Sequence, residues 1–215
     1  MRSRECAARP VRVHRPGDSD LRAVPILAAL ERHGVSYVLV GSYGAIVQGV
    51  DLPMTDLDIV PATGSANRDR LVAALKDLGA RERRGEVIEA AYELMEDPSS
   101  LTDTTFWTFT TEYGDLDVVL RPAGFPQGYD DLVDGVVIVR LVDEGDPSLA
   151  VDAVVADVSA IYTSKRLAGR QKDIESLPAF TGIHPTNAKE AVRQRYLQER
   201  ARRSASDPGK PSDGT

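Results

Sequence analysis

Cysteine and histidine are both scarce in this chain of 215 residues, which has one cysteine, Cys6, and three histidines. A single thiol excludes an intrachain disulfide framework and a cysteine-rich zinc site. The histidines stand far apart, at positions 14, 33 and 184, which argues against a histidine-based metal centre. The lone cysteine is typical of a protein of the reducing cytoplasm, and we expect that location.

Long apolar runs and an excess of positive charge are also missing. No run of about 18 apolar residues occurs, so no membrane span is predicted. The first twenty residues carry five arginines but no apolar core, which argues against a targeting signal. The net charge of -7 argues against non-specific nucleic-acid binding by the bulk surface. A local basic patch or a bound metal can offset that average, so a nucleic-acid substrate is still compatible with the composition.

The composition indicates one folded domain with appendages. Hydrophobic residues make up 42% of the chain, enough for a core. Alternation and helical periodicity predict strands over 35–40, 56–60, 104–111, 113–120, 136–141 and 151–155. The same patterns predict helices over 19–33, 42–48, 66–78, 129–134, 157–169, 171–180 and 186–203. Residues 80–101 fit either a polar strand or a helix around Val87–Met95.

Two aspartates that flank one leucine are the most informative feature of the sequence. In the strand predicted over 56–60, Leu57 and Ile59 face one side and Asp56 and Asp58 the other. Carboxylates held this close repel each other unless a cation lies between them, and Mg²⁺ is a natural candidate. A polar strand end that happens to carry two aspartates is the plainer interpretation. The absence of a glycine at the required position excludes an EF-hand loop.

A third carboxylate comes from a later strand. Asp117 lies between Leu116 and Val118, and a two-metal site needs several shared oxygen ligands of this kind. Asp115 shares its face but stands in the predicted turn, so we favour Asp117. An exposed strand residue would have the same sequence pattern.

Gly41-Ser42 follows the first predicted strand, fourteen residues before Asp56. Glycine permits close approach of a ligand to the backbone, and the serine hydroxyl can donate to a phosphate oxygen. Small residues after a strand are also ordinary turn chemistry.

Basic residues are concentrated in the segment IYTSKRLAGRQKDIESL, residues 161–177 of an otherwise acidic protein. Lys165 lies near small residues, Ala168 and Gly169, that leave room for a ligand, and a lysine aimed at a triphosphate fits a metal site nearby. A solvated basic helix face is the alternative. Asp173 is either a residue favoured by the helix dipole or a partner that orients one of these cations.

Together these residues resemble the minimal nucleotidyltransferases of the DNA polymerase β superfamily. The signature of that superfamily is Gly-Ser, a spacer, Asp-x-Asp and a third aspartate on a later strand. The segment Ser164–Leu177 is similar to the "SK…R.KD…L" helix pair of AbiEii-like and MenT-like toxin nucleotidyltransferases. Two departures stand out: Pro53-Met54 replaces an arginine often seen there, and Asp173 follows Lys165 by only eight positions, fewer than in the longer toxins.

The resemblance implies an α/β (α+β) fold, with a small mixed twisted sheet, flanking helices and a C-terminal helical subdomain. We therefore expect a catalytic domain over 19–145 and a helical region over 146–203 that completes the cleft. The composition of the two ends predicts a mobile tail over residues 1–18 and a disordered tail over 204–215.

The resemblance also implies the chemistry. An NTP would bind with two Mg²⁺ ions, and its NMP would pass to an acceptor hydroxyl with release of pyrophosphate. The roles would be divided among metal ligands (Asp56, Asp58, Asp117), phosphate-binding residues (Gly41, Ser42, Lys165, Arg166) and the orienting carboxylate of Asp173. The implied acceptor is the 3′ end of a tRNA, which would make the chain a toxin with a cognate antitoxin protein. An aminoglycoside acceptor, a protein hydroxyl acceptor and a non-catalytic nucleotide-binding or interaction module are the alternatives.

Overall fold

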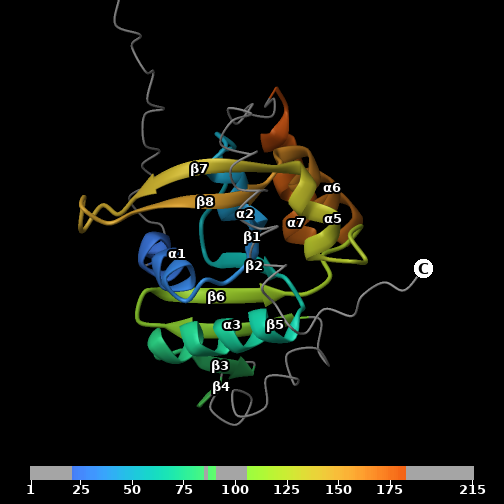
Figure 1. The fold of residues 1–215 in the computed structure, drawn as a ribbon. Helices are drawn as coiled ribbons and strands as arrows, with labels where there is room; N and C mark the ends of the chain where they lie inside the picture. The colour runs from blue at the N-terminus through green and yellow to red at the C-terminus, as the bar shows by residue number, and fades with distance from the viewer. Residues whose placement is uncertain (1–20, 85–86, 91–105, 183–215) are drawn as a thin grey trace, which may run out of the picture.

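The computed structural model describes residues 21–84, 87–90 and 106–182 (Figure 1). The helices are α1 (Ala23–Arg32), α2 (Gly41–Ile46), α3 (Ser65–Asp77), α5 (Tyr129–Leu132), α6 (Val158–Ala168) and α7 (Gln171–Ser176), with 3-10 turns η2 (Val133–Gly135) and η3 (Leu177–Phe180). The strands are β1 (Tyr37–Val40), β2 (Leu57–Pro61), β3 (Arg81–Arg84), β4 (Val87–Ala90), β5 (Phe106–Thr111), β6 (Gly114–Val119), β7 (Val136–Val142) and β8 (Ala150–Ala156).

These strands form one mixed sheet of eight strands in the order β4-β3-β5-β6-β2-β1-β8-β7. The pairs β2–β6 and β1–β8 are parallel, and the other neighbours are antiparallel. The α/β class with a mixed sheet, expected from the sequence, is confirmed. The central position of β2 and β6 matters most, because these strands carry the aspartates of the motif.

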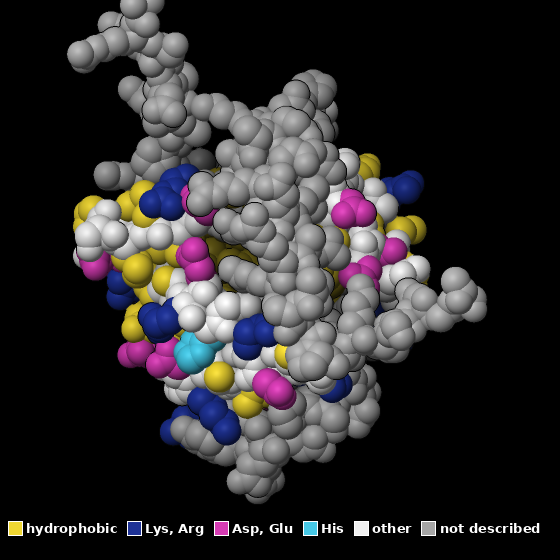
Figure 2. Space-filling model, viewed as in Figure 1, with side chains coloured by type: hydrophobic (Ala, Val, Ile, Leu, Met, Phe, Trp, Pro, Cys, Tyr) yellow, Lys and Arg dark blue, Asp and Glu magenta, His cyan; other side chains and the backbone are white. Residues whose placement is uncertain are grey.

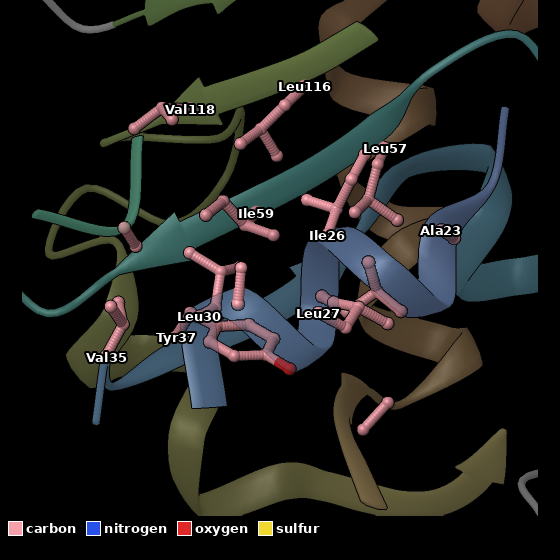
Figure 3. Packing of buried hydrophobic residues seen from close by; sticks show 14 of the residues in the cluster. Ala23, Ile26, Leu27, Leu30, Val35, Tyr37, Leu57, Ile59, Leu116 and Val118 are labelled. Atoms are coloured by element: carbon pink, nitrogen blue, oxygen red, sulfur yellow. The ribbon is translucent and has the colours of Figure 1, made fainter. Parts of the chain in front are cut away.

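Helices α1 and α3 cover one face of the sheet (Figure 1). Figure 3 shows Ile26 and Leu30 of α1 lying against the strand residues Leu57 and Ile59, with Leu116 and Val118 beside them. These side chains are fully or almost fully buried. The alternation of apolar residues in β2 and β6 therefore supplies this half of the core, and their intervening side chains point to the opposite face.

The second face is covered by α5, α6 and η3. A second apolar cluster there joins Val38 and Val60 of the sheet to Leu132, Ile161 and Phe180 of the covering elements. Both faces of the central strands are thus packed, and helix α6 is held on the face to which Asp58 belongs.

Most of the predicted elements are found, with ends shifted by a few residues. The unassigned stretch after α3 forms strands β3 and β4, which pair with each other. The predicted boundary at residue 145 falls in the loop between β7 and β8, and these two strands pair with each other in the sheet. The tails over 1–18 and 204–215 and the helix over 186–203 lie outside the described residues.

On the part of the face in Figure 2 that shows described residues, acidic and basic side chains lie among one another. None of the helices in the described ranges is both long enough and apolar enough to span a bilayer.

Candidate active site

The site begins with two aspartates on adjacent parallel strands. Strands β2 and β6 pair in a register that sets Asp58 opposite Asp117. The neighbouring residues of both strands belong to the α1–α3 core, so both carboxylates point to the other face. The sequence predicted each carboxylate face separately, and the parallel pairing aligns the two.

The two carboxylates hold their protons more tightly than ordinary aspartates. Desolvation, followed by the charges of Asp56 and Asp117, raises the pKa of Asp58 to about 7. Desolvation raises the pKa of Asp117 to about 6, against a hydrogen bond from Thr108 that lowers it. The Oδ1 atom of Asp117 is buried and has no hydrogen-bond partner among the described residues. One oxygen of this pair therefore lacks a donor among the described residues, and the positive charges of Lys165 and Lys172 only partly offset the raised pKa of Asp58.

Gly41 closes over this pair at the end of β1. Its φ of +66° is a conformation that residues with a Cβ rarely adopt. A Cβ placed on Gly41 would lie 1.8 Å from Oδ2 of Asp58, closer than any non-bonded contact allows. The backbone of the Gly41-Ser42 turn thus lies directly against the carboxylate, which only glycine permits.

A second group of charged residues, Lys165, Arg170 and Asp173, comes from helices α6 and α7 and the turn between them. Lys165 Nζ, from α6, donates to Ser42 Oγ at 3.3 Å and lies 3.5 Å from Oδ1 of Asp173. Asp173, from α7, is completely buried, and its Oδ2 accepts from Arg170 Nε at 2.6 Å. Burial works against ionisation of Asp173, but the hydrogen bond and charge of Arg170 hold its pKa below the ordinary value.

A turn between α6 and α7 makes the eight-residue spacing workable. In one continuous helix, Lys165 and Asp173 would stand about 12 Å apart along the axis. Gly169 instead ends α6 with a φ of +62°, and the chain turns before α7 begins. The two side chains therefore meet although the spacing is short.

A buried glutamine fixes α6 to the rest of the site. Gln48 Nε2 donates to the carbonyl oxygens of Gly44 (2.8 Å) and Ala156 (2.9 Å), and its Oε1 accepts from the N–H of Val158 at 3.1 Å. These bonds join the helix that follows β1 to the beginning of α6. The sequence analysis missed Gln48, since two of its three partners, Ala156 and Val158, lie more than a hundred residues away.

A cavity of about 540 Å³ opens above the carboxylates. The residues predicted from sequence that line it are Gly41, Ser42, Asp56, Asp58, Asp117, Lys165 and Asp173. Arg166 is exposed and does not belong to this lining, and Asp115 instead accepts a hydrogen bond from Thr110 at 2.8 Å. The lining also includes cations that the sequence analysis did not assign to the site (Arg121, Arg170, Lys172) and an apolar wall (Leu52, Pro53, Phe106, Val119, Pro122, Phe125).

The donor set fits a hard divalent cation. Among the described residues, no three His, Cys, Asp or Glu side chains are already gathered for metal ligation. One oxygen of Asp56 instead accepts a hydrogen bond from Thr55 Oγ1 at 2.9 Å. The charge of Asp56 nevertheless raises the pKa of both neighbouring carboxylates. Carboxylate oxygens are the preferred ligands of Mg²⁺, and a cation would satisfy the unpartnered oxygen of Asp117.

Comparison with known proteins gives only distant likenesses. No protein-family model and no curated protein sequence matches the chain. Among solved structures, it is similar to the lincosamide antibiotic adenylyltransferase LnuA in its lincomycin-bound form (15% identity, TM-score 0.45, covering 74% of this chain and 94% of the other). It is also similar to ANT(2″)-Ia in complex with adenylyl-2″-tobramycin (16%, 0.44, 82% and 94%). A third is a putative nucleotidyltransferase, TM1012, from Thermotoga maritima (15%, 0.42, 81% and 89%). TM-scores this low assign no activity to the chain.

Proposed function

We propose that this chain is a metal-dependent nucleotidyltransferase that moves NMP from an NTP to an acceptor hydroxyl. The observation that carries the proposal is the in-register pair Asp58–Asp117 directly beneath the Gly41 backbone. Placing two carboxylates side by side is unfavourable, and the described residues supply no donor to the buried Oδ1 of Asp117. Such an arrangement fits a site that is completed by a bound cation and its phosphate ligand.

The carboxylates divide the metal-binding and proton-transfer roles. Asp56 and Asp58 would hold one Mg²⁺ against the triphosphate, and Asp117 would help hold a second. Bound Mg²⁺ supplies Lewis-acid stabilisation of the entering and leaving oxygens. Asp117 accepts the proton of the attacking hydroxyl, whose oxygen bonds to the α-phosphorus while the bond to the bridging oxygen breaks and pyrophosphate leaves. Asp117 lines the cavity opposite Asp58, where the acceptor hydroxyl would lie.

The Gly41-Ser42 turn and Lys165 bind the triphosphate. Ser42 Oγ already accepts a hydrogen bond from Lys165, so one phosphate oxygen can contact both groups. Lys165 is largely buried, with 12% of its side chain exposed, so water screens its charge only weakly. Asp173 orients this lysine. Arg166, expected from sequence to share this task, points to solvent, and Lys172 in the cavity lining takes its place.

The acceptor that the cleft supports best is neutral or anionic. The described acidic residues that line the cavity are Asp56, Asp58, Asp117 and Asp173, all of which already have a role in the proposed site. Four cationic residues line it as well: Arg121, Lys165, Arg170 and Lys172. A polycationic aminoglycoside would need acidic groups to spare, whereas RNA brings phosphates and planar bases that suit cations and an apolar wall.

We therefore propose the 3′ end of tRNA as the acceptor. Modification there would block aminoacylation and stop translation, which makes the chain a toxin whose activity a cognate antitoxin protein restrains. The balance of acidic and basic residues in the cleft supports the tRNA acceptor. The resemblance of the Ser164–Leu177 helix pair to toxin nucleotidyltransferases supports the toxin role and its antitoxin.

The test is incubation of the pure protein with Mg²⁺, each α-labelled NTP in turn, and total tRNA. Wild type is expected to transfer label to tRNA, and Asp58→Asn to lose about 10³-fold or more of that rate, since a metal ligand is removed. Asp152→Asn, an exposed aspartate on β8, is the matched control and should label normally. Label on protein or aminoglycoside instead would refute the tRNA acceptor, and NTP binding without any labelling would refute transfer. In cells, expression tolerated only for Asp58→Asn supports the toxin role.

A further inference from the structure

Asp173 is in contact with two cations, and the two contacts are unequal. Arg170 holds the carboxylate at both oxygens, Nε to Oδ2 at 2.6 Å and an Nη atom to Oδ1 at 3.4 Å. Lys165 approaches Oδ1 at only 3.5 Å, at the outer limit of a hydrogen bond. The buried carboxylate is therefore bound mainly by Arg170.

Because Asp173 is bound more closely by Arg170 than by Lys165, most of the positive charge of Lys165 remains available on the side of Ser42. Two positive groups and one negative group leave a net charge of one positive unit. Arg170 is the exposed member, with 62% of its side chain accessible, whereas Lys165 points inward to Ser42. Without Arg170, the whole charge of Asp173 would act on Lys165, and the pair would be neutral toward a ligand.

We infer that Arg170 is a positioning residue, which neutralises Asp173 so that the charge of Lys165 stays available to the triphosphate at Ser42. The inference rests on the proposed function, since it needs an anionic ligand at that turn. Arginine suits the task because its planar fork can contact both carboxylate oxygens, which a lysine cannot do. Its location is set by the backbone: Arg170 directly follows the Gly169 turn and precedes the first residue of α7.

The test is equilibrium binding of each of the four fluorescent mant-NTPs with Mg²⁺ to the full chain. Arg170→Gln is expected to weaken binding about tenfold, and Arg170→Lys about threefold, because lysine keeps the charge but loses the fork. The decisive variant is Arg170→Gln/Asp173→Asn, which removes the carboxylate that Arg170 neutralises. Its affinity should return to within about threefold of wild type.

The control is Arg140→Gln, which breaks an exposed arginine–aspartate pair (3.0 Å, Asp152) on β7 and β8 and should bind normally. A double variant as weak as Arg170→Gln would overturn the inference, because Arg170 would then contact the ligand itself. Equal binding by wild type and Arg170→Gln would also overturn it. If wild type binds none of the four nucleotides, the proposed function fails first. If Arg170→Gln does not fold, Arg170→Lys against wild type decides.

Discussion

Two groups of carboxylates line one cleft, and their pKa values shift in opposite directions. On the strands, desolvation and like charge raise the pKa of Asp58 and Asp117 above the ordinary value, to about 7 and about 6. On the helices, Asp173 is more deeply buried, yet its cationic partners lower its pKa. The carboxylate of the helical group is paired within the protein, whereas in the strand group the described residues leave Oδ1 of Asp117 without a donor. The strand group is therefore the one that a bound cation would complete.

Gly41→Ala tests most strongly whether the strand group depends on close contact with the backbone. The new Cβ would clash with the Asp58 carboxylate, and we expect about 100-fold slower labelling together with about 3 kcal/mol lower stability. Gly79→Ala is the matched control, since Gly79 also has a positive φ but nothing lies within 4 Å of its Cβ position. Labelling rates and urea midpoints are the measurements. Equal effects of the two changes would mean that backbone strain alone explains the loss.

Asp173→Ala tests whether the helical group is complete. Removal of the carboxylate leaves Lys165 beside Arg170 without compensation, and we expect a loss of about 2–3 kcal/mol at pH 7. Because the pKa of Asp173 is lowered in the fold, its stabilisation exists above the ordinary aspartate pKa and is lost as the pH falls through the lower, folded value. The variant and wild type should therefore converge in acid. Asp152→Ala, which removes an exposed partner, should cost much less.

Gln48→Leu tests whether the helical group depends on the hydrogen bonds that anchor α6 to the sheet. Leucine has a similar size but leaves the N–H of Val158 and the carbonyl of Ala156 without their side-chain partner, which should cost about 1–2 kcal/mol. Looser anchoring of α6 should also weaken NTP binding through Lys165. Gln171→Leu changes an exposed glutamine on α7 and should be nearly neutral. Unfolding midpoints that do not differ between these variants would contradict the role of Gln48.

Of these site substitutions, Asp58→Asn should change stability least, and it should raise stability where the others lower it. A raised carboxylate pKa means that the folded state binds a proton more tightly than the unfolded state, so stability falls as the pH rises from about 4 to about 7. Asparagine removes that cost, and we expect the melting temperature to rise by a few degrees at pH 8 but not at pH 4. Mg²⁺ should stabilise wild type at pH 8 more than the variant. A lower melting temperature for Asp58→Asn at pH 8 would show that the carboxylate is already satisfied.

Much of the site could be predicted from local patterns. Alternation in β2 separates Leu57 and Ile59 from Asp58, and the glycine before Ser42 marks the turn. The sequence could not predict which of the four basic residues of segment 161–177 line the cavity, because that depends on how far the chain turns at Gly169. That turn brings Arg170 and Lys172 into the cavity lining, whereas Arg166 stays in solvent. Gln48 was missed for a related reason: nothing near it in the sequence shows that its partners come from β8 and α6.

The sequence by itself determined the two-residue period of the strands, and hence that Asp58 and Asp117 each oppose a core face. It also determined where a positive φ is available, because only glycine adopts that conformation at little cost. The tertiary structure alone decided that β2 and β6 pair in parallel with these aspartates in register, and that α7 brings a buried carboxylate to Lys165. The physical reason is range: sterics and periodicity act between neighbours in the chain, whereas register and charge compensation arise only when distant segments pack together.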